Sequence, residues 1–308
     1  MAAINPRPSR VPVVALLFAN LALACGPLLV RLAGTDGGVG PVAAGFWRLT
    51  LALPVLLIAT ASGGERVSGR WHMAIALVLV AGIAFAADLG LWHLGIFHTR
   101  LGNATLFGNV TALLFPLYGF LVARTWPSTR QTGTLAIALM GALLLLGRSY
   151  HLAASNMVGD LLCLLAGICY TIYLIAIGRI GDRVGPVTTL TLSVTAGIPV
   201  LLVFALALDE QVWPRSWGAL VLLALGSQLI GQGLITYAIR RVTPLVLGLM
   251  LLVQPIVSAT IGWVHYGERL GALDLLGGVA IIAAMLMVRD DRRPRPLPDA
   301  ALPLGSPA

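Results

Sequence analysis

Residues 41–57, PVAAGFWRLTLALPVLL, recur at 186–202 as PVTTLTLSVTAGIPVLL. The two stretches align without gaps at an offset of 145 residues, and each carries a proline at its first and fourteenth positions. Both are apolar runs close to the length of about 20 residues that a transmembrane helix needs. Two such matched segments predict that the chain consists of two related copies.

The rest of the chain is as apolar as these two segments. Of its 308 residues, 58% are hydrophobic and only 10% are charged, with a mean hydropathy of +0.92, whereas soluble domains carry about 25% charged residues. Ten predicted spans leave no length for a folded soluble domain, which excludes a membrane-tethered soluble enzyme and a receptor with an ectodomain. The spans are predicted at 12–33, 42–61, 71–97, 104–123, 132–147, 157–178, 187–208, 217–239, 244–264 and 271–288.

The two copies cover 12–148 and 157–288, so that each contains five spans. Because five is an odd number, the second copy must cross the membrane in the opposite orientation to the first. The predicted fold class is an all-α membrane protein whose ten transmembrane helices form two inverted five-helix repeats around a central cavity. Inverted repeats with a pathway between the halves are the architecture of a secondary transporter.

The arginines predict the orientation in the bilayer. Of the 20 basic residues, 14 lie on the side of the two termini, five lie on the opposite side, and Arg48 lies within a span. By the positive-inside rule both termini are cytoplasmic, and we expect a multi-pass protein of the plasma membrane, in bacteria the inner membrane. Residues 1–11 form a cytoplasmic tail, and the Pro-rich, charged tail at 289–308 is predicted to be disordered. The net charge of +8 is scattered over the loops, which favours lipid contact and predicts no nucleic-acid partner.

Three features together resemble the drug/metabolite transporter superfamily, specifically its ten-helix proteins with two EamA domains. They are GPVAAGFWRLTLALP at 40–54 with an Arg inside the span, the proline-containing fourth and ninth spans, and VQPIVSATIGWVHYGERLGALDLLGG at 253–278. The resemblance covers about 12–288. The first copy departs from the pattern, because ARTWPSTRQ at 123–131 lacks the Gly-Glu pair of the second copy, so no role of Glu268 carries over to it.

This resemblance implies a basket of helices with a cavity lined by spans 1, 3, 4, 6, 8 and 9. Spans 5 and 10 would act as scaffold or self-association elements, which leaves a monomer or a homodimer open. It also implies export or exchange of small organic solutes, with amino acids and related metabolites the commonest cargo, and no cofactor.

Two opposite charges are predicted to lie inside the bilayer, where a charged side chain is costly. At 1.5 Å per residue, Arg48 in span 2 and Asp88 in span 3 reach similar depths, which predicts an ion pair between them. One interpretation is a static clip between the two spans. The other is that Asp88 exchanges a proton or meets a substrate amine during transport. Its pKa would then be set by the competition between desolvation and the positive charge of Arg48.

Neutral polar and aromatic side chains recur on the remaining spans. Amides and hydroxyls facing lipid would be unsatisfied, so an inward face is expected, around a helix break at Gly26-Pro27 in span 1. For any one of these residues, a hydrogen bond between helices or a place in the aromatic belt at the membrane interface explains its presence in a span as well as substrate contact does. Taken together they favour a polar pathway for an uncharged or zwitterionic solute. The candidates for the substrate cavity are Asn20, Trp92, Asn109, Tyr170, Tyr173, Gln228, Gln232, Tyr237, Gln254 and Ser258.

Other chemistries find less support in the sequence. His93 and His98 are five residues apart, too far for the i, i+4 spacing of a zinc-binding helix, and all five histidines are expected near the membrane interfaces, so no metal site is predicted. No enzyme motif and no channel-filter segment is visible. The expected protein is therefore a secondary transporter of small organic metabolites, most of all amino acids or similar zwitterions, working by alternating access. A multidrug or other metabolite permease of the same fold is the alternative within this class. The alternatives from other functional classes are an intramembrane enzyme and a channel, for which the sequence offers no motif.

Overall fold

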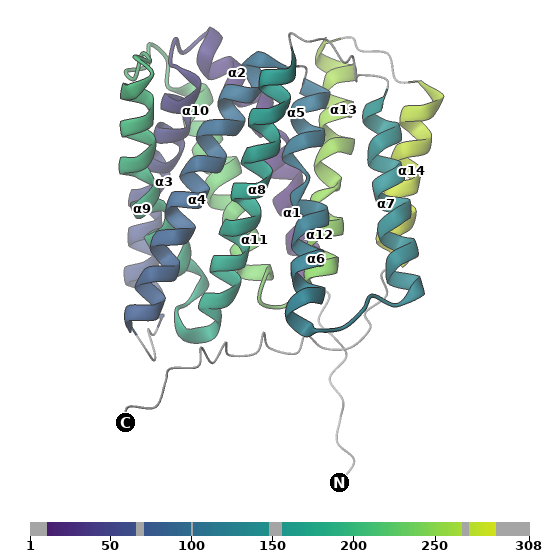
Figure 1. Ribbon diagram of the computed structural model, residues 1–308. Helices are drawn as coiled ribbons and strands as arrows, with labels where there is room; N and C mark the ends of the chain where they lie inside the picture. Colours follow the sequence, from purple (N-terminus) through teal and green to yellow (C-terminus); the bar gives the residue numbers. More distant parts are fainter. Residues whose placement is uncertain (1–10, 66–70, 100, 148–155, 267–270, 288–308) are drawn as a thin grey trace, which may run out of the picture.

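The computed structural model describes residues 11–65, 71–99, 101–147, 156–266 and 271–287. Within these ranges the chain is helical and forms one bundle (Figure 1). The first half contains α1 (Val11–Ala24), α2 (Gly26–Thr35), α3 (Pro41–Gly63), α4 (Trp71–His98), α5 (Leu101–Gly108), α6 (Thr111–Ala123) and α7 (Thr129–Gly147). The second half contains α8 (Met157–Ile180), the short η2 (Gly181–Arg183), α9 (Pro186–Ala207), α10 (Gly218–Leu222), the π-helix η3 (Leu223–Gln232), α11 (Gly233–Ala238), α12 (Pro244–Leu251), α13 (Val253–Tyr266) and α14 (Ala272–Met287).

Every predicted span coincides with one of these helices or with a consecutive set of them. Among the described residues, six helical stretches are long and apolar enough to cross a membrane, and three shorter apolar helices accompany them. The predicted all-α membrane fold is thereby confirmed. The division into copies at 12–148 and 157–288 stays a prediction.

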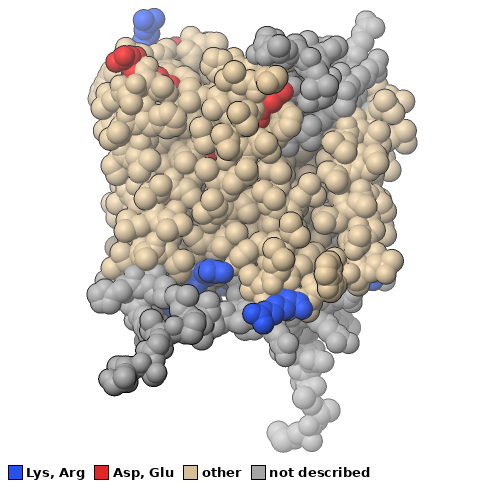
Figure 2. Space-filling model, viewed as in Figure 1, with Lys and Arg blue, Asp and Glu red and all other residues tan. Residues whose placement is uncertain are grey.

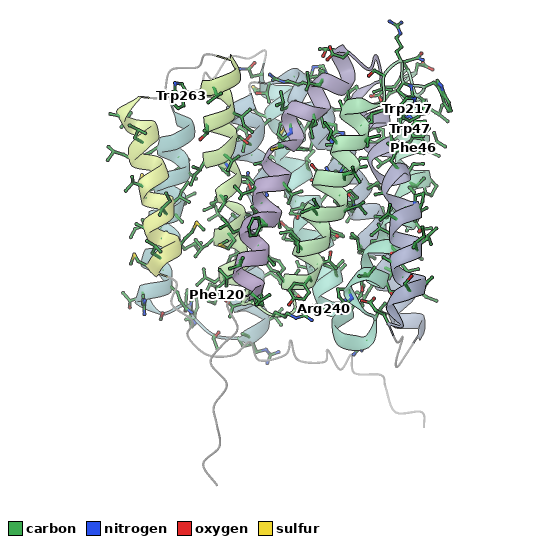
Figure 3. The ribbon with its side chains drawn as sticks, turned by 180° about the vertical axis from the view of Figure 1, so that it is seen from behind. Phe46, Trp47, Phe120, Trp217, Arg240 and Trp263 are labelled. Carbon is green, nitrogen blue, oxygen red and sulfur yellow. The ribbon has the colours of Figure 1, made fainter. Side chains whose placement is uncertain are left out.

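The surface has the pattern of a membrane protein. Charged side chains gather at the two ends of the face shown in Figure 2, with uncharged residues between them. Figure 3 shows Trp47, Trp217 and Trp263 at one end of the bundle and Arg240 at the other. Tryptophan rings at one level suit a membrane–water interface, where their apolar bodies and polar N–H groups both find partners.

Helix α3 receives its N-terminal cap from the end of α9. The backbone N–H groups of Val42 and Ala43 donate to the two carboxylate oxygens of Glu210, at 3.2 and 2.8 Å. Glu210 follows α9 by a few residues, after Asp209 in the left-handed conformation at φ 52°. A carboxylate here satisfies N–H groups that no helical carbonyl can reach, and it complements the positive end of the helix dipole. At Gly40 a side chain would overlap Glu210, so the cap depends on that glycine.

Helix α9 receives the same cap from the end of α3. The N–H groups of Val187 and Thr188 donate to Glu65 at 3.2 and 2.8 Å, the distances seen at the other end. Gly185 stands where Gly40 stands in the first copy, and a side chain there would overlap Glu65. Each helix therefore starts where the other ends, and α3 and α9 run antiparallel. The two glutamates are 145 residues apart, which is the offset of the sequence repeat, and the inversion of this helix pair follows from their positions.

Three of the spans are broken near their middle. α1 gives way to α2 just before Pro27, α12 gives way to α13 at Leu252 just before Pro255, and α5 gives way to α6 at residues 109–110. A proline lacks the N–H that would bond the carbonyl four residues earlier, so it weakens the helix at that point. Breaks of this kind inside a membrane need polar or aqueous surroundings to satisfy the freed backbone groups.

Helices α7 and α14 form an outer pair at one edge of the bundle (Figure 1). Their backbones approach closely at Gly141, where a side chain would collide with the carbonyl of Gly277 and with Ala280. Small residues permit this packing, which in membranes relies on van der Waals contact. The pair lies apart from the residues of the site described next, as expected for spans 5 and 10.

Candidate functional site

A cavity of about 70 Å³ lies where helices of both halves meet. Figure 3 shows α1, the purple ribbon, in the middle of the bundle, and Leu23 and Ala24 at the end of this helix line the cavity. The wall takes residues from α1, α2, α3, α4, α5, α6, α8, η3, α12 and α13. Of the candidates predicted from the sequence, the structure brings together Arg48, Asp88, Trp92, Asn109, Tyr170, Gln232, Gln254 and Ser258.

The three helix breaks meet at this cavity. Pro27, Asn109 and Leu251 all stand at a break, and all three line the wall. Broken helices at the interface of two repeats are where transporters place their binding sites, because loosened backbone and polar side chains become available to a solute. The position of the cavity thus follows from the fold and, at two of the three breaks, from Pro27 and Pro255.

Arg48 is the basic residue of the wall and is only 2% exposed. Its Nε donates to Gln228 Oε1 at 3.1 Å and its Nη2 donates to the carbonyl of Ser227 at 3.4 Å, so η3 of the second half holds a cation carried by α3 of the first. The guanidinium also lies over the ring of Phe85, 5.9 Å from the centroid. A guanidinium has five N–H donors in a fixed fork, and these contacts fix its orientation.

Asp88 is the acidic residue of the same wall, carried by α4. It lies near enough to Arg48 for an electrostatic interaction. Among the described side chains, however, the Arg48 guanidinium gives its hydrogen bonds to Gln228 and Ser227 and none to the carboxylate. The predicted direct ion pair stays a prediction, and what the geometry offers is a small cavity with one charge of each sign.

Aromatic and amide groups complete one side of the wall. Tyr170 on α8 and Gln232 on η3 exchange weak hydrogen bonds at 3.3 and 3.4 Å. Trp92 lies one helical turn after Asp88 on α4, which brings its ring and the carboxylate to one side of the helix. The indole contacts Gly108 at the α5–α6 break, where a side chain would crowd its Nε1.

Amides on the first and ninth spans join the two halves beside the cavity. Gln254 Nε2 on α13 donates to Asn20 Oδ1 on α1 at 2.8 Å, and Asn20 donates to its own helix at the carbonyl of Leu16. Asn109 donates to the carbonyl of Thr105 at 2.8 Å. Ser258 lines the wall with a buried hydroxyl that makes no hydrogen bond within the described part of the chain.

Four predicted cavity residues lie outside the wall. Asn20 and Gln228 stand one contact behind it, as partners of Gln254 and Arg48. Tyr173 is fully buried and stacks against Phe85 with ring centroids 4.6 Å apart. Tyr237 lies away from the cavity, under the guanidinium of Arg241 at 4.0 Å from its centroid.

His93 differs from its expected interfacial position. Its side chain is 0% exposed, and Nδ1 lies 2.9 Å from the carbonyl oxygen of Pro41 at the start of α3. Because a carbonyl only accepts, Nδ1 carries the proton and Nε2 is left as a buried acceptor with no partner in the described residues. The ring fits beside Gly45, whose missing side chain leaves it room. His93 is therefore a contact between α3 and α4.

Sequence reasoning missed three further features. Thr111 lines the cavity, and its hydroxyl donates to the carbonyl of Gly167 on α8 at 2.6 Å. The sequence analysis assigns no role to Glu65 and Glu210, although their equal placement after matched helices is visible in the repeat. Within the described residues no three His, Cys, Asp or Glu side chains cluster in a way that could hold a metal ion.

Comparison with known proteins gives a consistent result. The EamA-like transporter family matches residues 157–289. The chain is 28% identical over 272 residues to the threonine/homoserine exporter RhtA of Escherichia coli (strain K12), covering 84% of this chain and 88% of that protein. It is 21% identical over 261 residues to the uncharacterized transporter YyaM of Bacillus subtilis (strain 168), covering 82% and 85%.

A solved crystal structure shares the fold. It superposes with a TM-score of 0.75 at 18% sequence identity, covering 90% of this chain and 96% of the other. This likeness shows a shared fold. The match over the second half and the likeness to named transporters over most of the length bear on the family. The match to an EamA-like transporter model and the likeness to named transporters support membership of the drug/metabolite transporter superfamily.

Proposed function

We propose that the protein is a secondary transporter that exports or exchanges small zwitterionic metabolites, amino acids above all, by alternating access between its two halves. Membership of the family supports transport of metabolites, and points to a transporter rather than an enzyme. The observation that carries the finer proposal is the cavity itself, in which Arg48 and Asp88 share one wall with neutral amides and hydroxyls. A charged pair of this kind matches a solute that carries one charge of each sign.

The size of the cavity supports a small solute over a drug-like one. A volume of about 70 Å³ accommodates roughly five water-sized groups, which is the scale of a small amino acid. Pockets for drug-sized ligands are typically about 300–1,000 Å³. The composition of the wall also disfavours phosphorylated solutes, because Arg48 is its basic residue and Asp88 offsets its charge.

Transport by the purified, reconstituted chain tests the proposal. Proteoliposomes are loaded with unlabelled threonine, homoserine or a mixed amino-acid pool, and entry of labelled threonine by exchange is followed. We expect saturable entry that depends on the trapped amino acid, with liposomes lacking protein as the control. Entry that rises linearly with concentration would instead indicate a channel. Absence of exchange for every amino acid, together with saturable uptake of labelled lipophilic drugs into the same vesicles, would favour the multidrug alternative.

We also propose that the protein lies in the plasma membrane with both termini in the cytoplasm. The distribution of arginine over the loops, 14 on the side of the termini against five, supports this orientation. Fusion of a reporter that is active only in the cytoplasm to residue 308 should give an active reporter. The same fusion after Arg215, in the loop between α9 and α10, should give an inactive one, and the reverse pattern would invert the topology.

A further inference from the structure

We infer that the cavity binds its solute in one fixed orientation, with the carboxylate at Arg48 and the ammonium group at Asp88. The inference rests on the proposed transport of zwitterions and adds the residues that read each charge. Both charges belong to one wall, so a single small solute touches both. The two side chains come from neighbouring helices of the first half, α3 and α4, which makes that half the reader of charge.

Arg48 lines the cavity wall, and the two residues that hold it, Ser227 and Gln228, stand behind that wall with buried donors of their own. Gln228 holds the guanidinium through its oxygen, and its own Nε2 is buried with no hydrogen bond among the described residues. The hydroxyl of Ser227, the neighbouring residue, is buried in the same state, and both side chains are 0% exposed. A buried donor without an acceptor is costly. A carboxylate brought to Arg48 supplies acceptors beside a cation whose orientation is already fixed, so this end of the site suits an anion.

The other end of the site suits a cation. Asp88 lines the wall, and within the described residues its interaction with Arg48 is electrostatic, without a hydrogen bond to the carboxylate. Its electrostatic partner is Arg48, whose Nε and Nη2 each donate one hydrogen bond to η3, so that a guanidinium with five N–H donors keeps others for a carboxylate. An ammonium group brings three donors, which a carboxylate can accept with charge assistance. Removing a carboxylate's water inside a membrane is expensive unless such a partner replaces it.

The ring of Trp92 and the hydroxyl of Ser258 border the space left for the solute's own side chain. Ser258 offers an unpartnered hydroxyl within the described residues, and Trp92 offers an apolar face. This combination suits a short side chain with a hydroxyl group.

Competition by analogues tests the orientation on the unmodified protein. Labelled threonine exchange is measured against unlabelled threonine, its decarboxylated amine and its deaminated hydroxy acid. Each analogue leaves one buried charge without its partner, so we expect each to compete at least about 100-fold more weakly than threonine. Equal competition by either analogue would overturn the inference even though exchange itself succeeds. Absence of threonine exchange altogether would overturn the proposed function first.

Two variants then assign the charges. Arg48→Gln should lose discrimination against the amine and keep discrimination against the hydroxy acid. Asp88→Asn should do the opposite. Ser193→Ala changes the residue that occupies the position of Arg48 in the second copy, and it should keep both. These are ratios of competitors within one preparation, so a lower yield of folded variant does not alter them. Unchanged ratios in both charge variants, or the reverse assignment, would contradict the inference.

Discussion

Arg48 on α3 and Asp88 on α4 face one cavity in the first half of the chain, whereas the equivalent positions of the second half, 145 residues later, hold Ser193 and Gly233. Ser193 is buried, and its hydroxyl donates to the carbonyl of Thr189 in its own helix. Duplicated positions thus differ where the charges lie.

The same two halves agree where they hold each other. Gly40 and Glu65 recur at the same offset as Gly185 and Glu210, and the four cap distances match pairwise. Repetition accounts for the frame of the molecule, and divergence between the copies accounts for its chemistry. Equivalent substitutions at the shared positions of the two copies should therefore lower stability by similar amounts. Substitutions at the divergent positions should affect transport in one copy and not in the other.

Glycine substitution beside the caps should have the largest effect on stability. A methyl group in Gly40→Ala or Gly185→Ala overlaps the capping glutamate, so the cap is lost and the loop must shift. We expect each to cost about 2–4 kcal/mol, seen as a lower Tm of the detergent-purified protein. Gly218→Ala is the control, since an added methyl meets nothing within 4 Å there. A tolerated Gly40→Ala would mean that the cap is not needed.

Removal of the glutamates should have the next largest effect, and it should be equal at both ends. Glu65→Ala and Glu210→Ala each delete two charge-assisted bonds, for an expected loss of about 1.5–3 kcal/mol. Glu→Gln keeps one acceptor at each place and should cost less than Glu→Ala. Thermal unfolding in one detergent gives the comparison. A large difference between Glu65→Ala and Glu210→Ala would show that the equal distances conceal unequal energies.

A polar contact present at one end of the α3–α9 pair should contribute less. Thr60 and Thr191 share a hydrogen bond of 2.8 Å toward the Glu65 end. The corresponding place at the other end holds Phe46 and Ala205, which cannot form it. Thr60→Val should cost about 0.5–1.5 kcal/mol in thermal unfolding. A loss as large as that of Glu65→Ala would mean that the frame depends on this bond as much as on the caps.

The pH dependence of the Glu210 cap should be the smallest effect. Burial raises the pKa of Glu210 above its ordinary value of 4.5, and the two N–H donors of α3 oppose the shift. The folded protein therefore keeps the proton at pH values where the unfolded chain has lost it. Wild type should lose stability relative to Glu210→Gln as the pH rises from below 4.5 to the raised pKa, and the difference should be constant above it. Tm values of both proteins across pH 3.5–7.5, an assay range chosen to span about three units above the ordinary carboxylate pKa, provide the measurement, and a difference moving the other way would contradict this sign.

The sequence was sufficient for the spans and for much of the cavity wall. Apolar runs define helices directly, because a bilayer demands about 20 apolar residues per crossing. Polar residues at helical spacing within those runs, such as Gln254 and Ser258, had to turn away from lipid, and the structure places both in the cavity wall.

Contacts between residues distant in the chain could not be predicted from the sequence. Arg48 bonds Gln228 across 180 positions, and Glu210 caps Val42 across 168. No local pattern specifies such pairs, since they arise only once two helices lie side by side. The expected interfacial position of His93 was wrong for a related reason. A polar ring suggests a membrane interface unless its hydrogen-bond acceptor, here the carbonyl of Pro41, is known.

The reciprocal glutamates also order events during synthesis. Glu65 is synthesised directly after α3, before Val187 and the rest of α9 that it caps. The start of α3, in turn, has no cap until Glu210 has been synthesised. A chain cut between the halves would hold a cap without a helix end to receive it. Such a half could form the caps only with a second half inserted in the opposite orientation. The ends of α3 and α9 therefore specify that the two copies pair with inverted topology.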